Sequence, residues 1–201
     1  DLVLHSATKY IGGHSDVTGG VVTGSMELIG QIRATRIDTG GSMSPDDAYL
    51  LRRGLETLPV RVRRQCDTAS RFAATLARHP GVAYVDYPGL ATHKSHETAR
   101  RTFDSGPEGV RYGAIVTVTP FGGREAGLEF ANRLRLTALA PSLGGTRSKA
   151  SHVASTTHRQ YDERSLAAAG IDPGAVRFSI GLEDADDLIS DAYVALESLG
   201  R

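Results

Sequence analysis

The sequence predicts an α/β fold in two parts, the end of one α/β domain followed by a smaller α/β domain. Short apolar segments such as Leu2–Leu4 and Val176–Ile180 alternate with stretches of helical periodicity. A long amphipathic segment separates the two parts, and 40% hydrophobic and 23% charged residues are typical of a globular protein. We place the boundary near Gly54, so that residues 1–54 form the first part and residues 55–201 the second.

In the first part, two short strands flank a glycine-rich loop. Leu2–Leu4 and Gly20–Thr23 are apolar and rich in β-branched or large side chains, and helical periodicity follows across Met26–Ala34. A second helix is expected after Ser44, whose hydroxyl can cap it, with Pro45 suited to its first turn.

In the second part, helices and strands alternate. Apolar residues at helical spacing extend the helix after Ser44 to about Arg78, and Pro80–Gly81 ends it. We then expect strands at Val82–Val85, Ala114–Val118 and Val176–Ile180, and helices at Glu125–Leu136 and Asp186–Leu199.

Charge and composition exclude several classes of partner. The formal net charge is zero, which argues against nucleic acid or an anionic membrane surface. No apolar stretch approaches the roughly 20 residues that span a bilayer. The single cysteine, Cys66, excludes an internal disulfide framework and predicts a cytoplasmic protein. Because Asp1 leads directly into a strand of the kind that α/β domains bury on both faces, we expect the chain to be the C-terminal part of something larger.

The string HSATKY places a lysine, Lys9, at the end of an apolar strand beside two hydroxyls, Ser6 and Thr8. A lysine amine is nucleophilic only when neutral, and burial lowers its pKa from about 10.4. In an extended chain Ser6 and Thr8 would point to one side and Lys9 to the other. Gly12 and Gly13 would let the backbone fold tightly. These features predict a lysine that meets a phosphorylated carbonyl compound, although such a short string and loop glycines also occur as plain turn chemistry.

The longer string LVLHSATKYIGGHSDVTGGVV resembles the segment that carries the cofactor lysine in the pyridoxal-phosphate enzymes of cysteine and methionine metabolism. This family includes cystathionine γ-synthase, cystathionine γ- and β-lyases, methionine γ-lyase and the homoserine-ester sulfhydrylases. Further strings resemble its later landmarks in the right order: SPDDAYLLRRGLETLPVRV, YPGLATHKSHETARR, SLGGTRS, ASTTH and VRFSIGLEDADDLI. The resemblance implies that residues 1–54 end the cofactor domain of a type I PLP-transferase (aminotransferase-like) fold and that residues 55–201 form its small C-terminal domain.

The resemblance also implies roles for individual residues. Lys9 is similar to the lysine that forms a Schiff base with pyridoxal 5'-phosphate and then moves protons as a general base. Ser6 and Thr8 resemble ligands of the cofactor phosphate. Ser142 of SLGG and Arg177 of VRFSIG resemble the residues that bind the substrate carboxylate, a role that suits the planar guanidinium. Without the motif, Arg177 reads as a solvated edge arginine and Ser142 as a turn residue.

The branch of the family stays open. The synthases and lyases are expected to carry a glutamate soon after SLGG, whereas this chain has Arg147 and Lys149, which favour the sulfhydrylases. YPGLATHKSHE and SLGG favour the γ-lyases and γ-synthases. We expect C–S bond cleavage at Cγ or Cβ of an L-amino acid such as methionine, cystathionine or cysteine. The alternatives are γ-replacement by an O-acylhomoserine sulfhydrylase or cystathionine γ-synthase, a non-catalytic half-subunit partner, and an aminotransferase proper.

Several residues of the family lie upstream of the lysine and are not in this chain. They are the aspartate that pairs with the pyridine nitrogen, the aromatic residue stacked on the ring, the phosphate turn and a Tyr-x-Arg from a neighbouring subunit. The chain alone is therefore expected to be inactive and to need the preceding half, on the same or a second polypeptide. The resemblance further implies a homo-oligomer, a dimer of dimers, acting on a small amino-acid substrate.

Three other residues read as structural. His93 and His96 lack a third ligand nearby, so we expect surface histidines and no metal site. Cys66 lies on the apolar stripe of its helix and is expected in the core.

Overall fold

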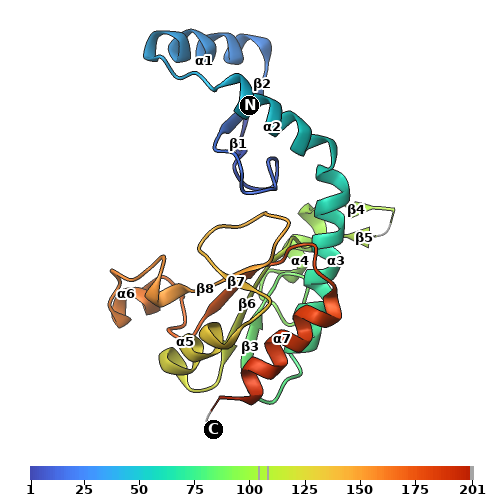
Figure 1. Ribbon diagram of the computed structural model, residues 1–201, viewed down its shortest axis with the longest axis vertical. Helices are drawn as coiled ribbons and strands as arrows, with labels where there is room; N and C mark the ends of the chain where they lie inside the picture. The colour runs from blue at the N-terminus through green and yellow to red at the C-terminus, as the bar shows by residue number, and fades with distance from the viewer. Residues whose placement is uncertain (104, 108, 200–201) are drawn as a thin grey trace. The chain divides into compact units, whose positions relative to one another are not determined.

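The computed structural model describes residues 1–103, 105–107 and 109–199. These residues divide into two compact units, Asp1–Val60 and the part of the chain that begins at Arg61 (Figure 1).

The first unit is a strand pair followed by two helices. β1 (Leu2–Ser6) pairs with β2 (Gly20–Gly24) in antiparallel register, from Leu2 opposite Gly24 to Ser6 opposite Gly20. α1 (Met26–Thr39) and α2 (Pro45–Glu56) follow. Both strands and the start of each helix agree with the expectation from sequence.

The first strand is exposed in the described chain, and its burial within something larger stays a prediction. All five residues of β1 are exposed, and its partner in the described chain is antiparallel. The described residues place no third strand beside this ribbon, and the apolar side chains Val3 and Leu4 of β1 remain 54% and 69% exposed.

The single long helix expected after Ser44 is two helices. Ser44 caps α2 as predicted, because its Oγ accepts a hydrogen bond from the backbone N–H of Asp47 at 3.0 Å. α2 then ends at Glu56 with Thr57 as its C-cap, and α3 (Leu58–Leu76) begins directly after this cap. Pro59 explains the break, since proline has no N–H to donate and fits only the first turn of a helix.

The second unit contains a five-stranded mixed sheet in the order β3-β6-β9-β8-β7. Neighbouring strands are antiparallel except β7 and β8, which are parallel. The strands are β3 (Val82–Asp86), β6 (Ile115–Pro120), β7 (Ala138–Leu139), β8 (Lys149–His152) and β9 (Val176–Ser179), with a separate pair formed by β4 (Ser105–Gly106) and β5 (Gly109–Val110). The helices after α3 are α4 (His96–Thr102), α5 (Gly123–Arg133), α6 (Glu163–Ala168) and α7 (Ala185–Glu197), with a 3-10 turn at Val153–Ser155.

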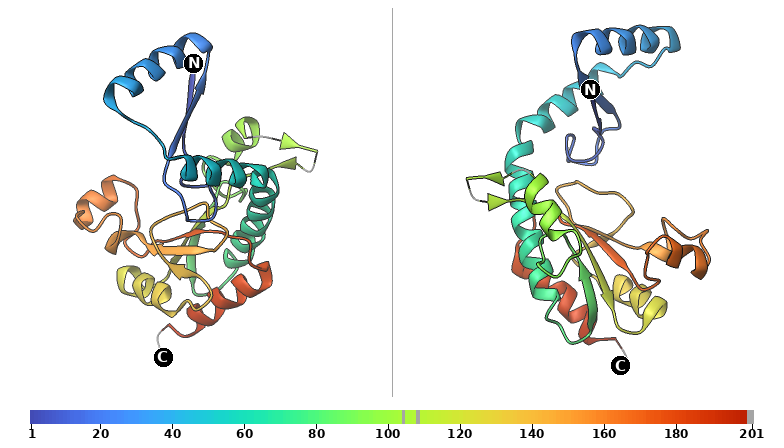
Figure 2. Two further views of the ribbon diagram at one scale, coloured as in Figure 1. Left: turned by 45° about the horizontal axis from the view of Figure 1, so that its top comes forward. Right: turned by 180° about the vertical axis from the view of Figure 1, so that it is seen from behind.

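One face of this sheet forms the core of the unit. The Phe178 ring of β9 lies 5.1 Å from that of Phe72 on α3 and 5.8 Å from that of Phe130 on α5, measured between ring centroids. Val116 and Val118 of β6 are fully buried on the same face. Figure 2 shows α3, α5 and α7 gathered around the sheet. Because side chains alternate along a strand, Arg177 points to the opposite face.

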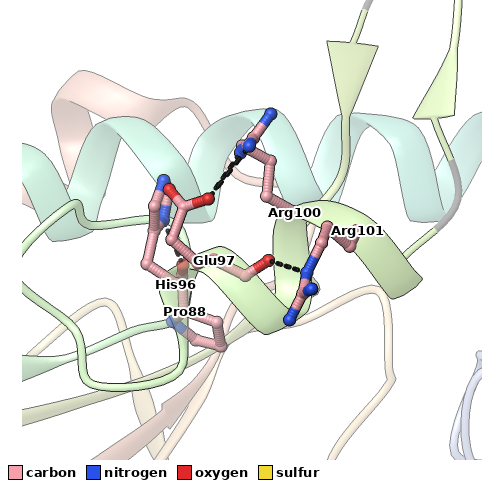
Figure 3. A network of polar contacts seen from close by, with 5 residues as sticks. All are labelled: Pro88, His96, Glu97, Arg100 and Arg101. Atoms are coloured by element: carbon pink, nitrogen blue, oxygen red, sulfur yellow. Dashed lines mark hydrogen bonds and ion pairs between the residues drawn. The ribbon is translucent and has the colours of Figure 1, made fainter.

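The sequence did not predict α4, which follows the turns after β3. The His96 ring nitrogen Nδ1 lies 2.8 Å from the Pro88 carbonyl, and Glu97 pairs with Arg100 and, through its backbone carbonyl, with Arg101 (Figure 3). The His96 ring also stacks on Tyr112 at 5.4 Å. His96 is thus not the plain surface histidine that was expected; it connects α4 to the preceding turn.

No helix in the described residues has the length and apolarity that crossing a membrane requires.

Candidate active site

Lys9 lies in a tight turn that follows β1 directly. The backbone N–H of Lys9 donates to the Ser6 carbonyl at 3.1 Å, and the Lys9 carbonyl accepts from the N–H of Gly13 at 2.8 Å. Gly12 N–H donates to the carbonyl of Ala7, which is fully buried. The chain is therefore not extended beyond Ser6, and the expected alternation of Ser6 and Thr8 against Lys9 does not hold. The turn itself fixes the backbone on both sides of the lysine.

A glycine on α2 allows the helix to pack directly on this turn. A Cβ placed on Gly54 would lie 2.6 Å from the carbonyl oxygen of Ile11 and would also clash with that of Gly12. Only glycine fits such a close backbone approach. Ala7, Val17 and Leu51 form the small core behind the turn. The lysine is therefore held on a rigid support.

The Thr8 hydroxyl connects the two ends of the glycine-rich loop. Its Oγ1 accepts a hydrogen bond from the N–H of Gly19 at 2.9 Å and donates to the Gly19 carbonyl at 3.4 Å. The donated bond is long, so this proton can turn to a stronger acceptor. Ser6, the last residue of β1, is exposed. Within the first unit, the structure thus brings Ser6, Thr8 and Lys9 together on one turn.

The second unit brings Ser142 and Arg177 together. Arg177 Nη2 donates to the carbonyl of Pro141, the residue before Ser142, at 2.6 Å. At the other end of the SLGG segment, the Gly144 N–H donates to Ser179 Oγ at 3.0 Å. Both contacts come from β9, so this strand positions the segment and carries the arginine. Arg177 is not a solvated edge residue.

Two further anchors of this segment were not foreseen. Gln65 of α3, fully buried, donates from Nε2 to the Gly145 carbonyl at 2.7 Å. Glu183 accepts from the backbone N–H and from the hydroxyl of Ser148, both at 2.7 Å. The same Ser148 Oγ accepts from the N–H of Gly181. The sequence does contain a sign of the Glu183 anchor. In the string SIGLED, Gly181 and Glu183 come directly after the strand that carries Arg177.

Replacing Glu183 with alanine should lower the free energy of unfolding by about 2–4 kcal/mol. The change leaves the Ser148 N–H and hydroxyl without their acceptor, and each unsatisfied buried donor costs about 1–3 kcal/mol. Chemical denaturation measures the effect. Glu197→Ala, at the exposed end of α7, is the matched control and should change stability by less than about 0.5 kcal/mol. Equal losses in the two variants would contradict the anchoring role.

Three further residues have structural surroundings: Cys66, His14 and His93, whose side chain was expected at the surface but is only 14% exposed. His93 Nε2 lies 2.7 Å from Asp86, and no group of three metal-ligating side chains occurs in the residues the structure describes. Cys66 is buried as predicted, and this burial raises the pKa of its thiol. His14 Nδ1 lies 2.7 Å from the Gly12 carbonyl and so braces the turn that carries Lys9.

Residues 1–197 match the family described as Cys/Met metabolism PLP-dependent enzymes. The chain belongs to this family.

Relatives in the family cover more than one reaction type. An L-methionine gamma-lyase of Pseudomonas putida is 44% identical over 200 residues, which are 98% of this chain and 49% of that protein. A crystal structure of cystathionine gamma synthase from Xanthomonas oryzae pv. oryzae, in complex with cystathionine, has a TM-score of 0.88 and 43% identity over 98% of this chain and 50% of its own. The chain spans about half the length of these relatives.

A more distant structure shows the cofactor of the family. A protein of Campylobacter jejuni described as an O-acetylhomoserine (thiol)-lyase has a TM-score of 0.88 and 31% identity, over 98% of this chain and 54% of its own, and its structure contains a pyridoxyl-lysine monophosphate.

The residues of the Lys9 turn fit that cofactor. An exposed hydroxyl at the end of β1, a second hydroxyl with a weakly used proton and a lysine lie within four positions, from Ser6 to Lys9. Hydroxyl donors suit a phosphate ester, and an amine suits an aldehyde. The donor set of this turn therefore matches a phosphorylated aldehyde, the chemical class of pyridoxal phosphate.

Proposed function

We propose that this chain supplies the reactive lysine and the carboxylate-binding segment of a PLP-dependent enzyme that cleaves a C–S bond at Cγ or Cβ of an L-amino acid such as methionine, cystathionine or cysteine. The observation that carries the proposal is Lys9, held on a rigid, glycine-backed turn in a chain that matches the family over residues 1–197. The named relatives that act on sulfur-containing amino acids support the substrate class.

Each residue has a role that its surroundings support. Ser6 and Thr8 bind the cofactor phosphate through their hydroxyls. When bound, pyridoxal phosphate withdraws electrons from the substrate Cα. The Lys9 amine takes the proton from Cα and returns it later in the reaction, as a general acid and base. Ser142 and Arg177 bind the α-carboxylate, because the guanidinium matches it with two parallel hydrogen bonds.

In this proposal, residues 1–54 are the end of the cofactor domain and residues 55–201 are the small C-terminal domain. The active protein also contains the preceding half, since the chain spans about half of its relatives. It assembles as a homo-oligomer, a dimer of dimers, in the cytoplasm.

A γ-replacement reaction is the second candidate. Arg147 and Lys149 follow the SLGG segment where the lyases and synthases are expected to carry a glutamate, and Arg147 is exposed. A cation there suits an anionic group of the substrate. This favours an O-acylhomoserine sulfhydrylase, whereas the likeness to a cystathionine gamma synthase structure supports cystathionine γ-synthase as the other γ-replacement reaction.

A product assay on the holoenzyme separates the candidates. With L-methionine, L-cystathionine or L-cysteine alone, a lyase releases a keto acid and ammonia. A γ-replacement enzyme forms a new thioether from an O-acylhomoserine only when a thiol is added. Neither product, with no visible imine absorbance, would contradict the proposal and leave the chain as a non-catalytic half-subunit partner. Transamination without loss of sulfur would instead indicate an aminotransferase.

A further inference from the structure

Two buried polar atoms, one of the carboxylate-binding arginine and one of a neighbouring serine, have no hydrogen-bond partner among the described residues. Arg177 Nε and Ser151 Oγ are both buried, and neither has a hydrogen-bond partner among the residues that the structure describes. Ser151 as a whole is 3% exposed. An unsatisfied buried polar atom costs about 1–3 kcal/mol, so two of them at one place in the sheet call for an explanation.

These two atoms belong to residues directly opposite each other on neighbouring strands. Ser151 of β8 pairs with Arg177 of β9, and Thr117 of β6 pairs with Arg177 on its other side. All three side chains lie on the same face of the sheet, where Cβ atoms of opposite residues are about 4.5–5.5 Å apart. At this separation a serine hydroxyl can reach the first nitrogen of a guanidinium through a change of rotamer.

The rest of the guanidinium is already oriented. Nη2 donates to the Pro141 carbonyl at 2.6 Å, which directs the end of the side chain toward the SLGG segment. The Nε–H, by contrast, has no hydrogen-bond partner among the described residues. Thr117 is half-buried and its hydroxyl is not among the unsatisfied buried atoms, so Ser151 is the neighbour that gains most from pairing.

We propose that Ser151 is a positioning residue for Arg177. Its hydroxyl accepts the Nε–H, and the guanidinium is then held with its Nη atoms directed at the Pro141 carbonyl and at the substrate α-carboxylate. This inference rests on the proposed function, in which Arg177 binds that carboxylate.

The test compares three variants of the holoenzyme: Ser151→Ala, Ser151→Thr and Thr117→Val. Loss of a hydrogen bond to a charged group changes an equilibrium about 10-fold or more. Ser151→Ala should therefore raise KM for the amino-acid substrate about 10-fold and leave kcat within about 2-fold. Ser151→Thr keeps a hydroxyl and should retain the wild-type KM, and Thr117→Val should leave it unchanged. Chemical denaturation of each variant checks that it folds cooperatively, so that a raised KM is not the result of unfolding.

A pair of reagents isolates the carboxylate effect. Aminooxyacetate carries a carboxylate and O-methylhydroxylamine does not, and both consume the visible imine absorbance. Ser151→Ala should slow only aminooxyacetate, about 10-fold. Equal slowing of both reagents, or an unchanged KM, would overturn the role of Ser151 while the proposed function stands. A wild-type holoenzyme that reacts with neither reagent would instead contradict the proposed function, and this inference with it.

Discussion

Replacing Lys9 with alanine should lower kcat of the holoenzyme by about four orders of magnitude. Positioned general acid–base groups contribute about 10²–10⁴ in rate, and Lys9 additionally holds the cofactor covalently in the proposed function. Residues 1–60 contain no lysine other than Lys9, so no other amine of the first unit can replace it. Steady-state product formation and visible absorbance measure the two consequences separately.

Lys94 provides the matched control for this experiment. The chain has three lysines, Lys9, Lys94 and Lys149, and Lys94 is exposed in the connection before α4. Lys94→Ala should keep kcat within about 2-fold, as expected for a surface substitution. Turnover by Lys9→Ala close to the wild-type rate would rule out the role assigned to this residue.

Replacing Phe178 with alanine should lower the free energy of unfolding by about 3–5 kcal/mol. The side chain is 1% exposed and contacts the rings of Phe72 and Phe130, so its removal leaves a cavity between two helices and the sheet. Phe178 also separates Arg177 from Ser179, which hold the SLGG segment, so the change should weaken the candidate site as well.

Urea denaturation checks the expected loss. Phe121→Ala is the control, because this phenylalanine is 64% exposed and its removal opens no buried cavity. It should change the free energy of unfolding by less than about 0.5 kcal/mol. A loss below about 1 kcal/mol for Phe178→Ala would mean that the core of the second unit lies elsewhere.

The regular elements with strong apolar periodicity could be predicted from the sequence. β6, β9 and α7 lie within a few residues of their expected positions, because each buries one continuous apolar stripe. β8 was missed, since its sequence KASH is short and polar and gains its burial only from neighbouring strands. α4 was missed for a similar reason, as Ala99 is its one buried residue within the described chain.

In the candidate site, too, some features could be predicted from the sequence and others could not. The motif residues Ser6, Thr8 and Lys9 are adjacent in the sequence, so their grouping could be foreseen. The contact of Gln65 with Gly145 joins residues 80 positions apart, and no local pattern encodes it. The chain at Lys9 forms a turn and not the expected extended segment. The Lys9 N–H donates to the Ser6 carbonyl and the Gly13 N–H donates to the Lys9 carbonyl, and these two bonds close the turn.

The most direct test of the account is to reduce the holoenzyme with borohydride and to map the modified residue by mass spectrometry. Reduction converts an imine between a lysine and pyridoxal phosphate into a stable secondary amine. The account predicts one pyridoxyl-phosphate adduct, on the peptide that carries Lys9. An adduct on Lys94 or Lys149, or a fully assembled enzyme with no adduct on any of the three lysines, would contradict it.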